Sequence, residues 1–476
     1  MEKSSLKVLF QSVLFLSAFA VISVGLSLGL VTDWNILDHL AMVDRFHSGG
    51  NLYSGMADFP TMASSNYFPG LSYIIMGMMW FIPDGFIIEA MHGLGITFLI
   101  GFFIVQFLIT KDFVKTDLVH FTALWIFTTL LILNNWYFYA LKFKPDTLAL
   151  LIGLGALYVL QKYDQPERQN LFVVVISSVI LALPLVLKQQ YIAFIAGYIV
   201  YALFRRRVTS ALSAVIVASI ATLVISHVRS VENAWIWSVT VLADDGLNNL
   251  MIWGYEHFKL SIHLVTVSII LLWVAGLKSL HPLARPIRFI IDDMQLLRRP
   301  WAIPLIFASG ASFLSGLKSG GNVGNTELAI ILLFPFIFLI FKGIDRNISV
   351  AIACVALMIS TADAFRGIKS YQQFGQAEAF FNGLEHSKTE NVFTTSDYYG
   401  VVRNQRNKTG IHNWHHEILI NKVGDDDLPA FIHNRNFAYV VLPAFSPINV
   451  ELEKGFGYEP VYQNNQLMIL KKDGGV

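Results

Sequence analysis

Two acidic residues near the N-terminus could serve as proton acceptors. Asp33 follows the first long apolar run of the chain, and Asp38 lies in a short amphipathic segment just beyond it. A carboxylate at the end of a membrane helix is partly desolvated yet still exchanges protons with water, which suits a general base. An aspartate at a helix end is also a common N-cap. Both acids are therefore candidate bases, with a capping role as the structural alternative.

Two other segments combine a lysine with a polar neighbour at the edge of an apolar run. Lys144 and Asp146 precede Thr147 at the start of one run, and Lys188 and Gln189 lie between two others. A lysine ammonium is a compact point charge that can bind a phosphate group. The structural alternatives are that Asp146 caps a helix and that Lys188 extends its ammonium to the membrane interface.

A further polar segment is rich in glycine. Lys318 precedes Gly320 and Gly321, and Asn322 and Asn325 follow. A bend of this kind exposes backbone N–H groups, which can hold an anion. The segment therefore predicts, together with the lysines above, a site for an anionic substrate.

The composition places most of the chain in lipid. Of its 476 residues, 55% are hydrophobic and 14% are charged, whereas soluble domains carry about 25% charged residues. The net charge of +1 gives no reason to expect a nucleic acid partner. The single cysteine, Cys354, cannot form an internal disulfide.

Apolar runs of about 20 residues are long enough to cross a bilayer as helices. Val8–Leu30 is longer than the apolar core of a signal peptide and is expected to be a retained first span. Leu71–Ile82 is too short and follows a turn-like Phe68-Pro69-Gly70, so we expect it to lie in or dip into the membrane. The eleven predicted spans are Val8–Leu30, Phe86–Ile109, Leu118–Leu133, Thr147–Leu160, Leu171–Leu187, Tyr191–Phe204, Thr209–Ile225, Leu260–Leu277, Ala302–Leu317, Leu328–Phe341 and Ile348–Thr361.

Loop charges orient these spans. With the N-terminus in the cytoplasm, most loop lysines and arginines, including Arg205-Arg206-Arg207, fall on the inner side, as the positive-inside rule requires. Counting Leu71–Ile82 as a span would invert most of the chain. An odd number of spans places the C-terminus outside. All the polar segments described above then lie on the outer face, where they can form one site.

From about residue 363 the composition becomes mixed and polar. Strand-like runs occur at Asn391–Thr395, Phe437–Leu442 and Gln466–Leu470, and a helical pattern occurs at Ser370–Leu384. This length suits a small α/β domain with one core.

The predicted fold class is thus an α-helical polytopic membrane protein with about 11 transmembrane helices and a small C-terminal α/β extracytoplasmic domain. Residues 1–362 form the transmembrane domain, whose first outer loop, 32–82, carries juxtamembrane helices. Residues 363–476 form the extracytoplasmic domain.

These motifs resemble the GT-C superfamily of membrane glycosyltransferases, in particular its family-39-like members, which use polyprenyl-phosphate-linked sugars. The chain departs from the family pattern in two places: Trp34 replaces a second carboxylate, and Gly70 replaces a second proline. The residues that carry the resemblance are Asp33-Trp34, Gly49-Gly50 with Tyr53, Tyr67-Phe68-Pro69-Gly70-Leu71, Lys144-Pro145-Asp146-Thr147-Leu148-Ala149-Leu150, Lys188-Gln189, and Lys318 with Gly321, Asn322 and Asn325.

The resemblance implies that a sugar moves, with inversion, from a polyprenyl phosphate donor to a glycan, lipid or protein acceptor on the outer face. Asp33 would be the general base, with Asp38 as its rival. The sequence shows no compelling metal constellation, and no cofactor is expected. The resemblance implies a bacterial inner membrane with the C-terminal domain in the periplasm. The implied substrate-binding residues are Tyr67, Lys144, Asp146, Lys188, Gln189, Lys318, Asn322 and Asn325.

Other interpretations remain open at this point. A transporter or flippase for lipid-linked sugars would place the outer polar residues on a translocation path, but usually has charges near the bilayer midplane. A polysaccharide polymerase or ligase would share the lipid phosphate site. The His412-Asn413-Trp414-His415-His416-Glu417 segment resembles a metal site but is expected to hold ordinary surface histidines.

Overall fold

The computed structural model describes part of the chain, including most of one helical bundle and most of the C-terminal sheet. The described residues are 34–53, 68–111, 121–122, 125, 145–163, 170–226, 297–317, 331–336, 368–369, 371–384, 390–395, 398–403, 407–411 and 428–473. The predicted spans Val8–Leu30, Leu260–Leu277 and Ile348–Thr361 lie outside them, as do most of Leu118–Leu133 and Leu328–Phe341.

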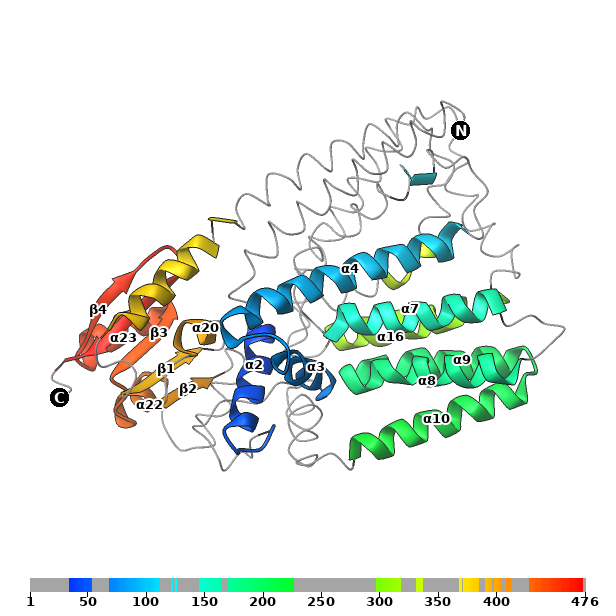
Figure 1. Ribbon diagram of the computed structural model, residues 1–476, viewed down its shortest axis with the longest axis horizontal. Coiled ribbons are helices and arrows are strands. Elements are labelled where there is room, and N and C mark those ends of the chain that lie inside the picture. Colours follow the sequence, from blue (N-terminus) through cyan, green and yellow to red (C-terminus); the bar gives the residue numbers. More distant parts are fainter. Residues whose placement is uncertain are drawn as a thin grey trace.

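Long apolar helices form the bundle, and Figure 1 shows them running side by side. Within the described residues, Asp84–Lys111 is the one helical stretch both long and apolar enough to cross a membrane, and α8, α9, α10 and α16 are shorter apolar helices. The spans predicted at Leu171–Leu187 and Ala302–Leu317 have the observed bounds of α8 and α16. The bundle helices are α4 (Ile87–Lys111), α7 (Pro145–Tyr163), α8 (Leu171–Leu187), α9 (Ile192–Phe204), α10 (Val208–Ser226) and α16 (Ala302–Leu317).

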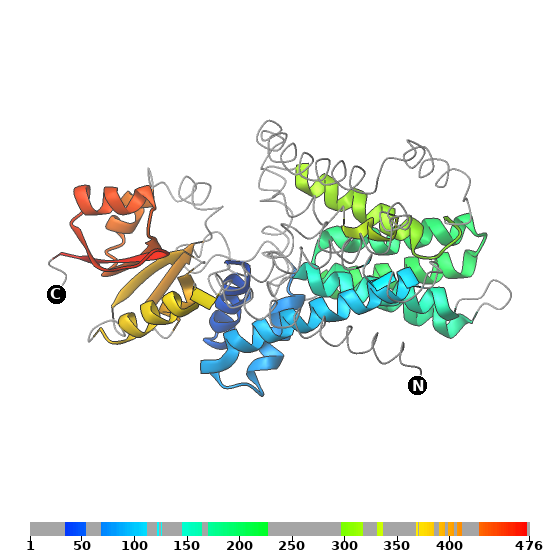
Figure 2. The same cartoon turned by 90° about the horizontal axis from the view of Figure 1, so that it is seen from above.

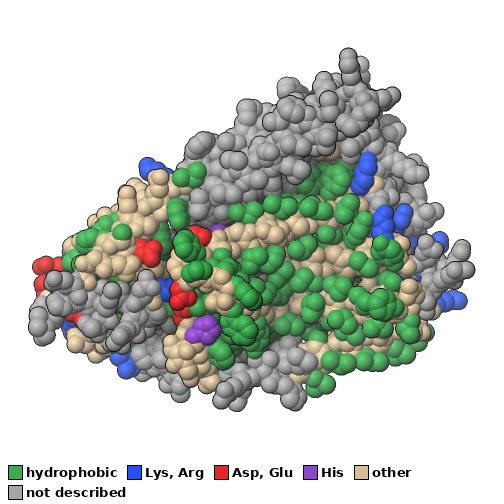
Figure 3. Space-filling model, in the orientation of Figure 1, with side chains coloured by type: hydrophobic (Ala, Val, Ile, Leu, Met, Phe, Trp, Pro, Cys, Tyr) green, Lys and Arg blue, Asp and Glu red, His purple; other side chains and the backbone are tan. Residues whose placement is uncertain are grey.

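The outside of the bundle is apolar, as lipid contact requires. On α10, Leu212, Ile216, Ile220 and Leu223 are all more than half exposed and recur every three to four residues, so they share one face. The small Ala214 is fully buried on the side facing the bundle. Figure 3 shows hydrophobic side chains over most of this surface. Soluble proteins rarely expose a continuous apolar patch of this extent.

Basic residues gather at the bundle end remote from the C-terminal sheet. Lys111 ends α4, Lys162 lies in the last turn of α7, and Arg205–Arg207 follow α9. Figure 3 shows this basic end at the right, opposite the sheet. The asymmetry is the one expected if the sheet lies outside and the basic end lies in the cytoplasm.

Two short helices lie between the bundle and the sheet (Figures 1 and 2). They are α2 (Trp34–His47) and α3 (Gly70–Met79), and a 3-10 turn, η2 (Asp84–Phe86), leads from α3 into α4. With 10 residues, α3 is about 15 Å long, which is too short to span, as the sequence predicts. Helix α2 buries every side chain over 37–43, Asp38 and His39 included, and exposes Phe46 and His47 at its end.

The described part of the C-terminal domain is built on a mixed five-stranded sheet with the order β2-β1-β3-β5-β4. Strands β2, β1 and β3 are parallel, whereas β5 runs antiparallel to both β3 and β4. The predicted strand at Asn391–Thr395 is β1, and the other two predicted strands overlap β3 and β5. The strands are β1 (Asn391–Thr395), β2 (Asn407–Ile411), β3 (Tyr439–Pro443), β4 (Tyr458–Gln463) and β5 (Leu467–Lys472).

Helices cover both faces of this sheet. The helical segment 371–382, predicted from the sequence as Ser370–Leu384, lies on one face, and α22 (Leu428–Asn434) and α23 (Pro447–Gly455) lie on the other (Figure 2). Aromatic side chains pack on each face of the sheet. Phe381 packs edge-on against Tyr439 on the first face, and Phe393 packs against Phe431 on the second. The sheet is therefore buried on both sides.

One hydrophobic core joins the sheet domain to α2, α3 and the start of α4. Buried Leu40 of α2, Ile75 of α3 and Met91 of α4 belong to the same cluster as Tyr399 and Phe431 of the C-terminal domain. A second cluster lies within the bundle itself. The predicted boundary at residue 363 falls outside the described residues, but the shared core shows that the sheet domain is packed onto α2 and α3.

Within the bundle, α9 and α16 approach closely at Gly197. A Cβ atom there would lie 2.6 Å from the Cα of Pro304 and 3.0 Å from the Cβ of Phe307. The Pro304 Cα is a backbone atom, which cannot move aside as the end of a flexible side chain can. A glycine is therefore required for this helix contact.

We predict that Gly197→Ala destabilises the folded protein by about 1–3 kcal/mol, because the added methyl group forces α9 and α16 apart. Thermal unfolding in detergent measures the effect. Gly310→Ala on α16 is the matched control, since its Cβ meets nothing within 4 Å. Equal unfolding temperatures for the two variants would contradict this account of the packing.

Candidate functional site

A buried ion pair lies at the end of the bundle nearest the C-terminal domain. The Lys188 ammonium donates hydrogen bonds of 2.9 and 3.2 Å to the two carboxylate oxygens of Asp146, and the Tyr191 hydroxyl donates one of 2.6 Å to the first of these oxygens. Asp146, Lys188 and Tyr191 are 8%, 6% and 1% exposed. Two segments predicted separately as site residues are thus in direct contact.

Local sequence explains how these side chains are held. Pro145 is the first residue of α7, a position where proline suits the start of a helix, and Asp146 follows it. Helix α8 ends at Leu187, and Lys188 is extended, with φ −156° and ψ 129°, before the 3-10 turn η3 (Gln189–Tyr191). This break between α8 and α9 allows a polar segment to sit between two apolar helices.

The structure shows what both side chains contact. Lys188 does not extend to an interface, because its side chain is buried against Asp146. Asp146 lies inside α7, and its carboxylate binds Lys188 and Tyr191. A buried charge without a partner is costly, so each of the two charged side chains stabilises the other in this buried position.

The Phe68-Pro69-Gly70 turn packs against the same end of α8. A Cβ on Gly70 would lie 2.8 Å from the carbonyl oxygen of Val186 and 2.9 Å from Leu187, and Phe68 packs on Leu185. The glycine that replaces the second proline of the family pattern is therefore required by this close approach. Three segments predicted separately, those of Gly70, Asp146 and Lys188, therefore meet around the end of α8.

Helix α2 reaches this region through α3. The Nδ1 atom of His39 is 2.9 Å from the Oγ atom of Ser72 on α3, and both residues are fully buried. Burial lowers the pKa of His39 to about 3, so the imidazole is neutral at physiological pH. Asp38, the neighbouring candidate base, is 2% exposed.

The remaining predicted residues are only partly placed. Gln189 is half-buried in η3, next to Lys188. The other predicted site residues lie outside the described part of the chain, so their roles stay predictions: Asp33, Tyr67, Lys144, Lys318, Asn322 and Asn325. The His412–Glu417 segment also lies outside it. Among the described residues, no group of three or more His, Cys, Asp or Glu side chains could hold a metal ion.

Two features of this region are not predicted from the sequence: Tyr191, and a group of charged residues where the C-terminal domain meets α2 and α4. Tyr191 lies three residues after Lys188, a spacing that returns a side chain to the same side of a turn. The interdomain residues carry no such signal, since Asp44 and Arg403 are far apart in sequence and contact only in the folded chain.

Two further acids, Glu89 and Glu378, interact electrostatically at the same junction. The Tyr371 hydroxyl donates a 3.3 Å hydrogen bond to Glu89 of α4, and Glu378 lies nearby on the helical segment 371–382. Burial, and then the charge of Glu89, raise the pKa of Glu378, whereas Arg403 opposes the shift. At neutral pH the ionised Glu378 therefore weakens this junction.

Comparison with known proteins identifies the fold. It is similar to that of ArnT from Cupriavidus metallidurans bound to undecaprenyl phosphate, with a TM-score of 0.59 and 12% identity over 98% of each chain. The same protein in the apo state has a TM-score of 0.58 and 11% identity over 99% of this chain and 98% of that one. No protein-family model and no curated protein matches the sequence. The resemblance predicted from the sequence is therefore confirmed at the level of the fold, which is that of a polytopic helical membrane protein.

We predict that Asp146→Asn and Lys188→Met each destabilise the protein by about 3 kcal/mol, because either change leaves a buried charge unpaired. The double variant should lose less than the sum of the two. Thermal unfolding in detergent measures the stability of the two single variants and the double variant. Lys162→Met, at the opposite end of α7, is the control. Additive losses would show that the pair is not coupled.

We also predict that Glu378→Gln raises the unfolding temperature by a few degrees at pH 7.5. Folding raises the pKa of this carboxyl above its unfolded value of about 4.5, so the folded state favours the protonated form. Its contribution to stability is therefore fully present below pH 4.5 and is lost as pH rises through the folded pKa. The benefit should therefore disappear near pH 4. Glu453→Gln, at an exposed position of α23, is the control and should show no gain at either pH.

Proposed function

We propose that the protein is a membrane glycosyltransferase that moves a sugar from a polyprenyl-phosphate-linked donor to an acceptor on the outer face of the membrane. The observation that carries this proposal is the buried Lys188–Asp146 pair beside the Phe68–Gly70 turn. It lies in a fold shared with a protein bound to undecaprenyl phosphate. A lipid phosphate needs a cation to bind it, and the ammonium of Lys188 is the cation of this pair.

Lys188 is the residue we assign to the donor phosphate. As the glycosidic bond breaks, negative charge grows on the departing phosphate, and an ammonium in a water-poor site stabilises that charge strongly. Asp146 and Tyr191 hold the ammonium in place before the donor arrives. Lys144 and Lys318 would add further positive charge, and Tyr67, Gln189, Asn322 and Asn325 would complete the donor site.

Asp33 is the proposed general base. It takes the proton from the acceptor hydroxyl while the acceptor oxygen bonds to the anomeric carbon. The bond from that carbon to the phosphate oxygen breaks, and its electron pair leaves with the polyprenyl phosphate. One displacement of this kind inverts the anomeric configuration. The burial of Asp38 favours Asp33 over its rival, because a base must reach the acceptor.

The location and the acceptor follow from the same proposal. We assign the protein to a bacterial inner membrane, with the N-terminus in the cytoplasm and the C-terminal domain in the periplasm, which agrees with the basic end of the bundle. The C-terminal domain would select the acceptor, which is a glycan, a lipid or a protein. The activity needs no cofactor in this proposal.

The described helices give less support to a transporter. In α7 the charged residues are Asp146 near the start and Lys162 near the end, and α8, α9, α10 and α16 contain none. In α4 they are Glu89 and Lys111, again near the ends. Translocation paths usually carry charges or broken helices near the midplane. A polymerase or ligase remains an alternative because it would use the same lipid phosphate site.

We predict that Asp33→Asn lowers kcat by about 10²–10⁴-fold while donor binding persists, because only the proton transfer is lost. The assay follows radiolabelled sugar transferred from polyprenyl phosphate donors by purified protein to a panel of acceptors. Asp38→Asn tests the rival base, and Asp473→Asn, which is exposed in the C-terminal domain, is the control.

A loss confined to Asp38→Asn would keep the enzyme and move the base. A wild-type protein that bound no such donor and transferred nothing to any acceptor would overturn the proposal in favour of a transporter.

A further inference from the structure

We propose that Arg403 is a positioning residue for sugar transfer. It fixes helix α2 between the C-terminal domain and the start of α4, and α2 contains Asp38 and directly follows Asp33 in sequence. Its consequence for catalysis rests on the proposed function, whereas the contact itself does not.

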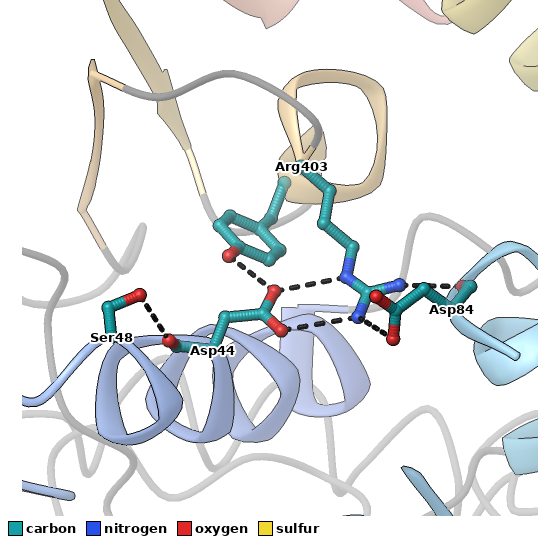
Figure 4. Close-up of polar contacts among 5 residues, drawn as sticks. Asp44, Ser48, Asp84 and Arg403 are labelled. Atoms are coloured by element: carbon teal, nitrogen blue, oxygen red, sulfur yellow. Dashed lines mark hydrogen bonds and ion pairs between the residues drawn. The ribbon is translucent and has the colours of Figure 1, made fainter. Parts of the chain in front are cut away.

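Arg403 binds α2 at two points (Figure 4). It follows α20 (Tyr399–Val402) in the C-terminal domain. Its Nε atom donates a 3.0 Å hydrogen bond to Oδ2 of Asp44, and Nη2 donates one of 3.2 Å to Oδ1. Two parallel bonds between a planar guanidinium and a carboxylate fix orientation as well as distance.

The same guanidinium also binds the segment that opens α4. Nη1 donates a 2.8 Å hydrogen bond to the backbone carbonyl of Asp84, and Nη2 lies 3.8 Å from the Asp84 carboxylate. Arg403 therefore joins the C-terminal domain, α2 and the start of α4. Gly400 reinforces this junction, since a Cβ there would lie 2.8 Å from Phe374 and 3.4 Å from Ile88 of α4.

Tyr399 completes the arrangement. Its hydroxyl donates a 2.8 Å hydrogen bond to Oδ2 of Asp44. Burial, and then the neighbouring Asp44, raise the pKa of Tyr399 well above its usual value, so the phenol keeps the proton that it donates. The Arg403 and Asp44 side chains are 10% and 16% exposed, so breaking their contact would leave charge in a water-poor junction.

The burial of α2 explains why a directional contact is needed there. Its apolar side chains, Leu37, Leu40 and Met42 among them, lie in the shared core, where contacts are not directional. The His39–Ser72 bond fixes α2 to α3 but not to the C-terminal domain. The Arg403–Asp44 bonds do fix it to that domain. A displacement of about 1 Å in a reacting group can cost 10²-fold in rate, so a helix leading from the candidate base must be held closely.

The test uses the full chain, since removing the C-terminal domain would expose the shared core. Arg403→Lys keeps the charge but loses the planar fork, and Asp44→Asn keeps an acceptor for Tyr399 but loses the charge. Arg435→Lys, the same change at an exposed position of the same domain, is the control. We expect kcat to fall at least tenfold in the first two variants, with the KM for the donor within about twofold, because the donor site lies on the bundle.

A second measurement needs no activity. Spin labels at exposed positions 47 on α2 and 453 on α23, in a Cys354→Ser background, report the distance between α2 and the C-terminal domain. We expect a narrow distribution in the parent and a broad one in Arg403→Lys and Asp44→Asn, but not in Arg435→Lys.

Each outcome has a definite meaning. Unchanged distance distributions would overturn the assigned contact, even if the protein proved not to be a transferase. Broadened distributions with unchanged kcat would overturn the role in transfer. If kcat and the donor KM changed equally, Arg403 would have a structural role and positioning would be rejected. The same holds if kcat fell only in proportion to the loss of folded protein. A wild type without transfer would count against the proposed function alone.

Discussion

A charged side chain taken out of water is costly unless an opposite charge lies within hydrogen-bonding distance. Two pairs in the described structure meet this constraint. Lys188 and Asp146 pair where α7 and α8 approach the C-terminal domain, and Arg403 and Asp44 pair where that domain contacts α2. In both, the partners come from segments distant in sequence, so the pairing holds those segments together. The arrangement of the whole junction depends on these contacts.

The layer of α2 and α3 connects the two pairs. Helix α3 packs on the end of α8 through Gly70, next to Lys188, and on α2 through the bond between Ser72 and His39. Helix α2 in turn meets Arg403 through Asp44. The C-terminal domain and the end of the bundle are therefore connected through packed helices. The domain is a structural part of the candidate site, because it supplies one wall of the core that encloses α2.

Some features of the chain could be predicted because they depend on local sequence. Apolar length and composition are enough to place helices in lipid, and α8 and α16 have their predicted bounds. Strand β1 also has its predicted bounds, since its apolar residues occupy the middle of the sheet. The edge strands β2 and β4 were missed. An edge strand faces solvent and needs no apolar alternation, and Pro460 in β4 reads locally as a break, although an edge tolerates proline.

The amino-acid sequence by itself therefore determined the membrane class, the orientation expected from loop charge, and the residue types at the candidate site. It also singled out Lys188 and Asp146, but as separate residues with structural alternatives. Only the tertiary structure decided that they pair, that Gly70 is required at a close helix contact, and that Arg403 holds α2. The physical reason is that hydropathy and helix period are summed along a short segment. An ion pair or a steric contact depends instead on distances between segments that only folding brings together.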